Sequence, residues 1–327
     1  MYFTLPDLPE ICPFPPSFNS HFESVAPESK AWIDSFGILS GRQRRYFSTS
    51  AFELLTAHAY PYADREGYRT SCDYMNVTFI LDDYSDDEGR RGARVMADSF
   101  MNALRDPTWD DGTTFAKLAR EFRGRLNTAS ATARQRFVDT FDHYLDATVR
   151  EAENREHGTV LGLKDFMELR RGNSGVEVAF AVIECILLID LQPEVFYHPT
   201  LSRLRRLIGN MLFTANDVYS YNKEQAGGHS ANNLITVIKE ERGVGLQEAF
   251  NVAGRFFENC AEEFLVYKEL LPSWGPEVDE AVSRYVTGLE CWVRGGIEWS
   301  LSGPRYFGDS VEEVRRTRRV VLAERVA

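Results

Sequence analysis

An acidic stretch about a quarter of the way along the chain contains the first residues that could do chemistry. Five acids fall within the seven positions 82–88, directly after the largely apolar run 74–81. Side chains four residues apart lie on the same face of a helix, so Asp82 and Asp86 would point the same way, together with Phe79. Like charges at this spacing repel each other, and a bound cation would offset the repulsion.

The cation that these side chains suit best is magnesium, which commonly binds through one or two carboxylates and the phosphates of a substrate. A calcium loop is a poorer interpretation, because counting from Asp83 places Glu88 where an EF-hand loop requires glycine. An acidic run can also be a solvated helix face. A second element is therefore needed to decide between a metal site and a solvated surface.

That second element lies within an expected helix over residues 201–226. Asn216, Ser220 and Glu224 are spaced at intervals of four and share one helix face. An amide oxygen, a hydroxyl and a carboxylate together form a magnesium site of low net charge. Ser and Asn inside a helix are unfavourable without a specific role. A solvated face is the alternative, but tyrosines flank Ser220 on both sides, which is unusual for such a face.

The composition excludes some classes of protein. The chain has 327 residues, of which 37 are Lys or Arg and 49 are Asp or Glu, giving a net charge of -12. This charge argues against a nucleic-acid-binding protein, which would neutralise phosphates with basic residues. The chain is 43% hydrophobic and 13% aromatic, which is enough for a large core and an apolar cavity.

The five cysteines lie far apart and show neither disulfide nor zinc spacing, so we expect a cytoplasmic protein. The first residues lack the basic and apolar regions of a signal peptide. The longest apolar run, 178–189, contains Glu184 and is too short to cross a bilayer, so no integral membrane segment is expected. A homodimer is expected only because such assemblies are common.

Apolar spacings of three and four dominate, and period-2 alternation is scarce, which predicts an all-α, single-domain helical bundle of ten or more helices. We expect an irregular, proline-rich arm over residues 1–28, one helical domain over 29–310 and a basic tail over 311–327. His229 is expected in a loop. The expected helices are 28–36, 42–60, 68–88, 94–105, one or two within 113–151, 166–190 with a break at 172–175, 201–226, 231–241, 245–270 and 276–301.

With both motifs in place, the chain resembles a class I terpene synthase of the single-domain microbial type over roughly residues 50–310. In that family an Asp-Asp-x-x-Asp motif and an Asn-Asp-x-x-Ser-x-x-x-Glu motif face each other across a helical bundle with a central apolar cavity. Residues 82–86 and 216–224 fill every defining position of the two motifs. The resemblance implies three magnesium ions, held by Asp82, Asp86, Asn216, Ser220 and Glu224, which bind the diphosphate of an isoprenoid.

The resemblance also implies a diphosphate-sensing arginine on a helix break, about 45 residues before Asn216. Arg171, followed by Ser174 and Gly175, fits that pattern, and Arg170 is the less favoured choice. All three favoured residues are expected to take part in binding the substrate.

Further roles come from the end of the family pattern. Arg305 and Tyr306 fit its C-terminal Arg-Tyr pair, and Lys223 fits the lysine before the metal-binding glutamate. These side chains would bind the diphosphate and, with Arg171 and Asp82, make up the expected catalytic set. Phe79 and Trp299 are candidates for facing a carbocation, with ordinary core packing as the alternative.

The implied reaction is magnesium-dependent ionisation of farnesyl diphosphate, loss of diphosphate and cyclisation to a sesquiterpene. The string at 82–88 resembles that of mushroom protoilludene-type synthases, which implies closure between carbons 1 and 11; geranyl diphosphate is a lesser candidate substrate. One alternative is a chain-elongating prenyltransferase, in which a second Asp-rich motif would replace residues 216–224. Another is an inactive helical protein that binds isoprenoids.

Overall fold

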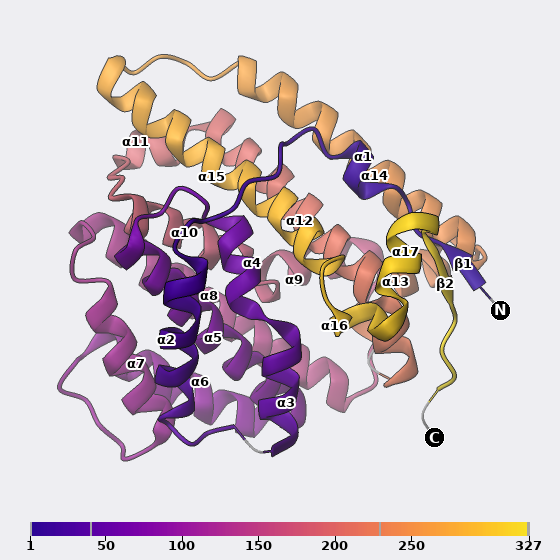
Figure 1. Ribbon diagram of the computed structural model, residues 1–327, viewed down its shortest axis with the longest axis horizontal. Coiled ribbons are helices and arrows are strands. Elements are labelled where there is room, and N and C mark those ends of the chain that lie inside the picture. Colours follow the sequence, from indigo (N-terminus) through magenta and orange to yellow (C-terminus); the bar gives the residue numbers. More distant parts are fainter. Residues whose placement is uncertain (1, 40, 229, 326–327) are drawn as a thin grey trace.

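The computed structural model describes residues 2–39, 41–228 and 230–325, so His229 lies outside the described residues. Helices make up most of this part of the chain, which confirms the prediction of an all-α bundle (Figure 1). Two short strands, β1 (Tyr2–Thr4) and β2 (Arg319–Val321), pair in an antiparallel manner. Among the helices of the described residues, none has the length and apolar character needed to cross a membrane.

The helices follow the expected order with adjusted boundaries. The first half contains α1 (Leu8–Ile11), α2 (Phe22–Asp34), α3 (Gly41–Ser50), α4 (Phe52–Ala59), α5 (Arg65–Asp87), α6 (Arg90–Arg105), α7 (Thr114–Arg125) and α8 (Ala131–Glu156). The second half contains α9 (Leu163–Asn173), α10 (Val176–Leu187), α11 (Pro193–Phe196), α12 (Pro199–Ala226), η1 (Ser230–Asn232), α13 (Leu234–Arg242), α14 (Leu246–Glu269), α15 (Pro276–Ser300), α16 (Pro304–Phe307), η2 (Gly308–Ser310) and α17 (Val311–Thr317). The expected helix 42–60 is divided, because Ala51 adopts a left-handed conformation (φ 49°) between α3 and α4.

Helix α10 positions the two motif-bearing helices. Its residues from Val178 to Cys185 are buried on all sides, as its apolar sequence predicts. It packs against α5 and α12, and also against α8 and α15. The helices that carry the two metal motifs are therefore both held against one buried helix.

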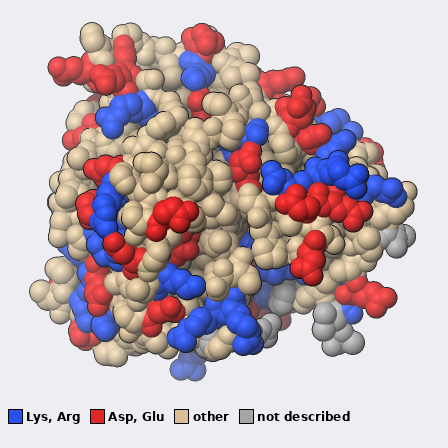
Figure 2. Space-filling view, in the orientation of Figure 1, with Lys and Arg blue, Asp and Glu red and all other residues tan. Residues whose placement is uncertain are grey.

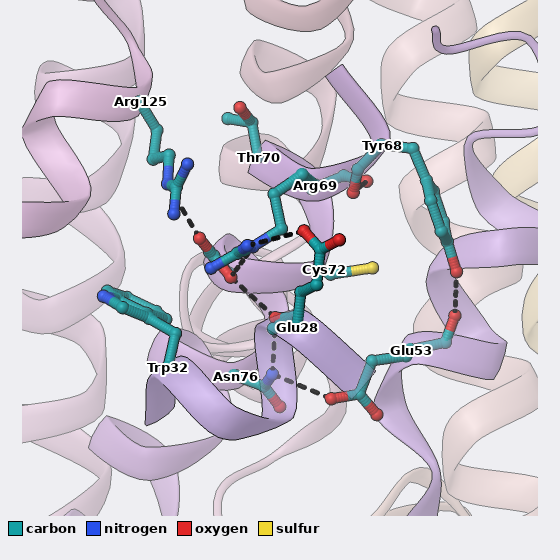
Figure 3. Close-up of polar contacts among 12 residues, drawn as sticks. Glu28, Trp32, Glu53, Tyr68, Arg69, Thr70, Cys72, Asn76 and Arg125 are labelled. Atoms are coloured by element: carbon teal, nitrogen blue, oxygen red, sulfur yellow. Dashed lines mark hydrogen bonds and ion pairs between the residues drawn. The ribbon is translucent and has the colours of Figure 1, made fainter. Parts of the chain in front are cut away.

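A buried network of ion pairs and hydrogen bonds holds the face of α5 opposite the one that carries Asp82 (Figure 3). Asp73 is fully buried and precedes Asp82 by nine positions, which is two and a half helical turns and places the two acids on opposite faces. The Asp73 carboxylate accepts hydrogen bonds from Arg69 Nε (2.9 Å) and Ser29 Oγ (2.6 Å), and forms an ion pair with Arg125 Nε at 2.9 Å. A buried carboxylate is tolerated only with such partners, so this network specifies the rotation of α5.

Both ends of the described chain pack against the helical body. Residues 2–28 contain β1, α1 and the start of α2, and bury Phe3 and Leu8 in the core. At the other end, the segment after α17 forms β2 and continues along α12. There the Asn222 Nδ2 donates to the Val321 carbonyl at 3.0 Å, and Gln225 Nε2 donates to the Ala323 carbonyl at 2.8 Å. The arm and the tail thus cover the helix that carries the second motif.

The close approach of α15 to α4 gives a test of this packing. A Cβ at Gly295 would lie 2.8 Å from the backbone of Ala59 and His58, which cannot move aside. We predict that Gly295→Ala lowers the free energy of unfolding by about 1–3 kcal/mol. The neighbouring Gly296→Ala is the control, because its Cβ would meet only Leu212 Cδ2 at 3.6 Å. Urea denaturation followed by circular dichroism measures both, and equal stability of the two variants would contradict the predicted contact.

Candidate active site

The acidic motif forms the last turn of α5. Asp82 is half-buried, and loss of solvent around its carboxyl, followed by the charges of Asp86 and Glu151, raises its pKa to about 8. Asp83 accepts a hydrogen bond from Gln43 Nε2 at 2.9 Å, and Asp86 forms an ion pair with Arg155 Nη1 at 3.2 Å. The crowded acids thus favour a further positive charge near Asp82.

The second motif lies on one face of α12, as predicted. The Ser220 hydroxyl is buried and lies near the Glu224 carboxylate, but it makes no hydrogen bond of normal geometry among the described residues. Asn216 accepts from Arg170 Nη2 at 2.8 Å and donates to the Tyr306 hydroxyl at 3.2 Å. Glu224 accepts from Asn233 Nδ2 at 2.9 Å, and burial, followed by the charge of Asp217, raises its pKa to about 7.

The same cations act on both motifs, which places the motifs around one volume. The guanidinium groups of Arg170 and Arg305 both oppose the rise in the pKa of Asp82 on α5. Arg170 is also hydrogen-bonded to Asn216 on α12. Loss of solvent, and then the charge of Arg305, lower the pKa of Lys223 to about 8, against the attraction of the acidic motif. The fold therefore brings the two predicted motifs together.

The residues present suit magnesium. Within the described ranges no three His, Cys, Asp or Glu side chains converge as a metal site, because two of the three candidates on α12 are an amide and a hydroxyl. Oxygen donors of this kind are those that a hard divalent cation takes. Within the part of the chain that the structure describes, Ser220 Oγ is a buried oxygen without a hydrogen bond of normal geometry, which a metal ion would satisfy. Ser220 thus supports the interpretation of this helix face as a cation site.

Of the two adjacent arginines on α9, Arg170 contacts the second motif directly. Arg170 Nη2 donates to the Asn216 side chain at 2.8 Å and to the Asp217 carboxylate at 2.7 Å. Burial lowers the pKa of the Arg170 guanidinium, but the charge of Asp217 outweighs this effect and raises that pKa. Arg171, which the sequence favoured, contacts Asn210 (3.3 Å) two turns earlier on α12. It lines a separate cavity of about 140 Å³ with residues of α8 and α10. Adjacent helical residues point about 100° apart, so only Arg170 reaches the motif.

The predicted helix break lies where the sequence placed it. Ser174 is the C-cap of α9, and its buried hydroxyl has no hydrogen-bond partner among the described residues. Gly175 is the N-cap of α10 and adopts a left-handed conformation (φ 68°) that favours glycine, and its carbonyl accepts from the Tyr74 hydroxyl at 3.4 Å. The break therefore follows Arg170 within five positions and ends the helix that carries it.

The C-terminal arginine lies in a box of aromatic rings. The guanidinium carbon of Arg305 is 5.0–5.3 Å from five ring centroids, those of Tyr46, Phe52, Phe79, Trp299 and Tyr306. Phe79 stacks on Phe52 with centroids 3.7 Å apart, and Trp299 Nε1 donates to the Ser50 carbonyl at 2.7 Å. The two predicted cavity aromatics therefore face a cation, which is the Arg305 side chain in this structure.

Sequence reasoning missed three residues that belong to this site. Tyr46 binds Arg305, Glu151 accepts from Asn173 and Asn232 at its two oxygens, and Asn233 caps α13 while it binds Glu224. Neither Tyr46 nor Glu151 is part of a spaced motif, so no pattern marks them. Asn233 had a weak signal, because Asn is a preferred N-cap residue.

Comparisons with known proteins agree with this site. Residues 73–263 match the family model described as "Terpene synthase family 2, C-terminal metal binding". The chain is 38% identical to a bifunctional terpene synthase, Agr4, of Cyclocybe aegerita, covering 99% of this chain and 94% of the relative. It is 36% identical to Delta(6)-protoilludene synthase 18 of Postia placenta, covering 97% and 92%. A protein of Coprinopsis cinerea named linoleate 10R-lipoxygenase COP4 is 42% identical, covering 98% and 93%.

Solved structures share the fold. Hedycaryol synthase in complex with HEPES gives a TM-score of 0.80 at 24% identity, covering 91% of this chain and 98% of that chain. Germacradien-4-ol synthase from Streptomyces citricolor gives 0.78 at 22% identity, covering 88% and 96%. The fold and the paired motifs define a metal-binding, all-α enzyme of isoprenoid chemistry. The sequence matches show that the chain belongs to the terpene synthase family, which confirms the resemblance.

The two adjacent arginines of α9 provide a matched test. We predict that Arg170→Gln lowers turnover of an isoprenoid diphosphate by about 100-fold or more, because a charged donor near the leaving group is lost. Arg171→Gln should leave turnover close to that of the unchanged protein. Steady-state release of diphosphate measures both, with circular dichroism as the check on folding. A larger loss in Arg171→Gln than in Arg170→Gln would instead support Arg171 as the diphosphate-sensing arginine.

Proposed function

We propose that this terpene synthase is a magnesium-dependent sesquiterpene cyclase that ionises farnesyl diphosphate and cyclises the resulting carbocation. The observation that supports this most directly is the pair of oxygen-bearing helix faces around shared guanidinium groups, next to an aromatic box. Asp82, Asp86, Asn216, Ser220 and Glu224 would hold the metal. Bound magnesium, in three ions as the family resemblance implies, supplies Lewis-acid stabilisation of the leaving group.

The residues of this chain would bind and orient the leaving diphosphate. Arg170, Lys223, Arg305 and the Tyr306 hydroxyl would donate hydrogen bonds to phosphate oxygens, and bonds to an anion are the stronger kind. Their charges are already in position around both motifs, so little reorganisation is needed as negative charge develops. Ionisation would therefore be favoured where these groups meet.

The carbocation needs a surface that stabilises positive charge and excludes water. Phe79 and Trp299 lie next to Arg305 in the aromatic box, and an aromatic face contributes about 2 kcal/mol to a desolvated cation. Ser174 and Gly175 lie at the break between α9 and α10, where backbone movement on binding would bring Arg170 closer to the diphosphate. We place the isoprenoid chain on the aromatic side and the diphosphate on the charged side.

Farnesyl diphosphate is favoured as the substrate over geranyl diphosphate. Several relatives are named sesquiterpene or protoilludene synthases, and 1,11-closure to a protoilludene-like product is proposed on the same ground. All five cysteines are buried and free, which is compatible with the expected cytoplasmic location. A homodimer remains a prediction from base rates.

The relative named as a lipoxygenase suggests a different chemistry. Iron sites in oxygenases commonly use imidazole ligands, whereas the donors gathered here are carboxylate, amide and hydroxyl oxygens. This donor set favours diphosphate ionisation over oxygenation. A chain-elongating prenyltransferase is disfavoured because Asn216 and Ser220 stand where that family has a second Asp-rich motif.

Incubation with farnesyl diphosphate tests the proposal. We expect diphosphate release that requires magnesium, is abolished by EDTA and yields a cyclic hydrocarbon by gas chromatography and mass spectrometry. A chain-elongating enzyme would require added isopentenyl diphosphate, and a binding protein would release no diphosphate. Either result would overturn the proposed function.

Substitutions at the two motifs test the metal residues. We predict that Asp82→Asn, and separately the double variant Asn216→Ala/Ser220→Ala, each abolish turnover while helical content is kept, because ligands on one motif are lost. Asp87→Asn is the matched control, since Asp87 is the exposed last residue of α5. Turnover in either motif variant close to that of Asp87→Asn would remove the metal assignment.

A further inference from the structure

One short helix, α3, contacts all three groups of residues that the proposed function uses. Gln43 Nε2 donates to Asp83 of the acidic motif at 2.9 Å. The Tyr46 ring lies 4.7 Å from Lys223 Nζ, beside the second motif. The Tyr46 hydroxyl accepts from Arg305 Nη1 at 2.5 Å. No family motif falls on this helix, so these contacts come from the structure alone.

The two hydroxyls of α3 hold one nitrogen of the Arg305 guanidinium. Besides Tyr46, the Ser50 Oγ accepts from the same Nη1 at 2.9 Å. The Arg305 Nε is buried and has no hydrogen-bond partner within residues 2–39, 41–228 and 230–325. A buried donor without a partner is rare in a folded protein and indicates a group that a ligand would satisfy. Helix α3 thus fixes one side of the guanidinium and leaves a donor for another acceptor.

The Tyr46 ring has a second role. Lys223 Nζ (4.7 Å) and the Arg305 guanidinium (5.0 Å) both lie close to the centroid of this ring, and the two positive groups repel each other. A ring face attracts a cation, which offsets that repulsion in part. Burial raises the pKa of Tyr46 to about 12, so the hydroxyl remains protonated and neutral.

The outer surface of α3 is basic although the chain is acidic overall. Arg44 and Arg45 are exposed, and Figure 2 shows basic side chains gathered over this helix. A local positive field raises the concentration of an anionic ligand near it. The charge of α3 therefore matches a diphosphate that approaches the acidic motif and its metal.

We propose that Tyr46 is a positioning residue for the diphosphate. Its hydroxyl orients Arg305, and its ring holds Lys223 in place. This inference rests on the proposed function. Helix α3 thereby takes a direct part in binding the leaving group, because it contacts the two cations Arg305 and Lys223. Ser50 shares the contact with Arg305, so loss of the Tyr46 hydroxyl weakens the arrangement without abolishing it.

Binding of inorganic pyrophosphate in magnesium buffer, measured by isothermal titration calorimetry, tests the inference apart from turnover. We expect Tyr46→Phe to bind pyrophosphate about tenfold more weakly, because one hydrogen bond to a charged group is lost. Ser50→Ala should weaken binding in the same direction. Tyr62→Phe is the matched control, since Tyr62 is 62% exposed and its hydroxyl forms a hydrogen bond with the Ser17 hydroxyl on the surface at 3.3 Å.

A double-mutant cycle separates positioning from general stability. If the hydroxyl acts through Arg305, adding Tyr46→Phe to Arg305→Gln should change pyrophosphate affinity by less than about twofold. Affinity of Tyr46→Phe equal to or tighter than that of Tyr62→Phe would overturn the inference, as would full additivity in the cycle. Failure of the unchanged protein to release diphosphate from farnesyl diphosphate would instead refute the proposed function. The two failures are therefore distinguishable.

Discussion

The repulsion among buried acids is the constraint on which the rest of this structure depends. Carboxylates at the end of α5 and on α12 surround one volume, and burial, followed by the charges of neighbouring acids, raises the pKa values of Asp82 and Glu224. Arg170 and Arg305 offset part of this cost without closing the site, since each is shared between elements. On the opposite face of α5, the buried Asp73 pairs with two arginines, Arg69 and Arg125. At Asp82, loss of solvent and the neighbouring acids raise the pKa, so a further cation would be favoured there.

Much of this arrangement could be predicted from sequence, because it depends on local periodicity. The spacing of Asn216, Ser220 and Glu224 specifies a shared helix face wherever that helix lies. The apolar sequence of α10 likewise specifies a buried helix. Pairing of the two motifs required more than periodicity, since it depends on how α10 packs against α5 and α12. The family resemblance supplied that step.

The features that the sequence does not specify depend on the rotation of one helix or on a single tertiary contact. Arg170 and Arg171 are chemically identical neighbours, and only the rotation of α9 sends the first toward Asn216 and the second toward Asn210. Tyr46 belongs to a helix with no distinctive spacing, and its partner Arg305 lies 259 positions away. The division between α3 and α4 depends on the left-handed Ala51, which no glycine or proline signals.

The aromatic box limits where positive and negative charges can lie during the proposed reaction. Its rings already face one cation, the Arg305 guanidinium. A carbocation formed nearby would be repelled by that group unless an anion lay between them. The diphosphate would be such an anion, hydrogen-bonded to Arg305 on one side and ion-paired with the carbocation on the other. Retention of the leaving group after ionisation therefore follows from the charge balance of the site, because its early release would leave two positive charges in one apolar space.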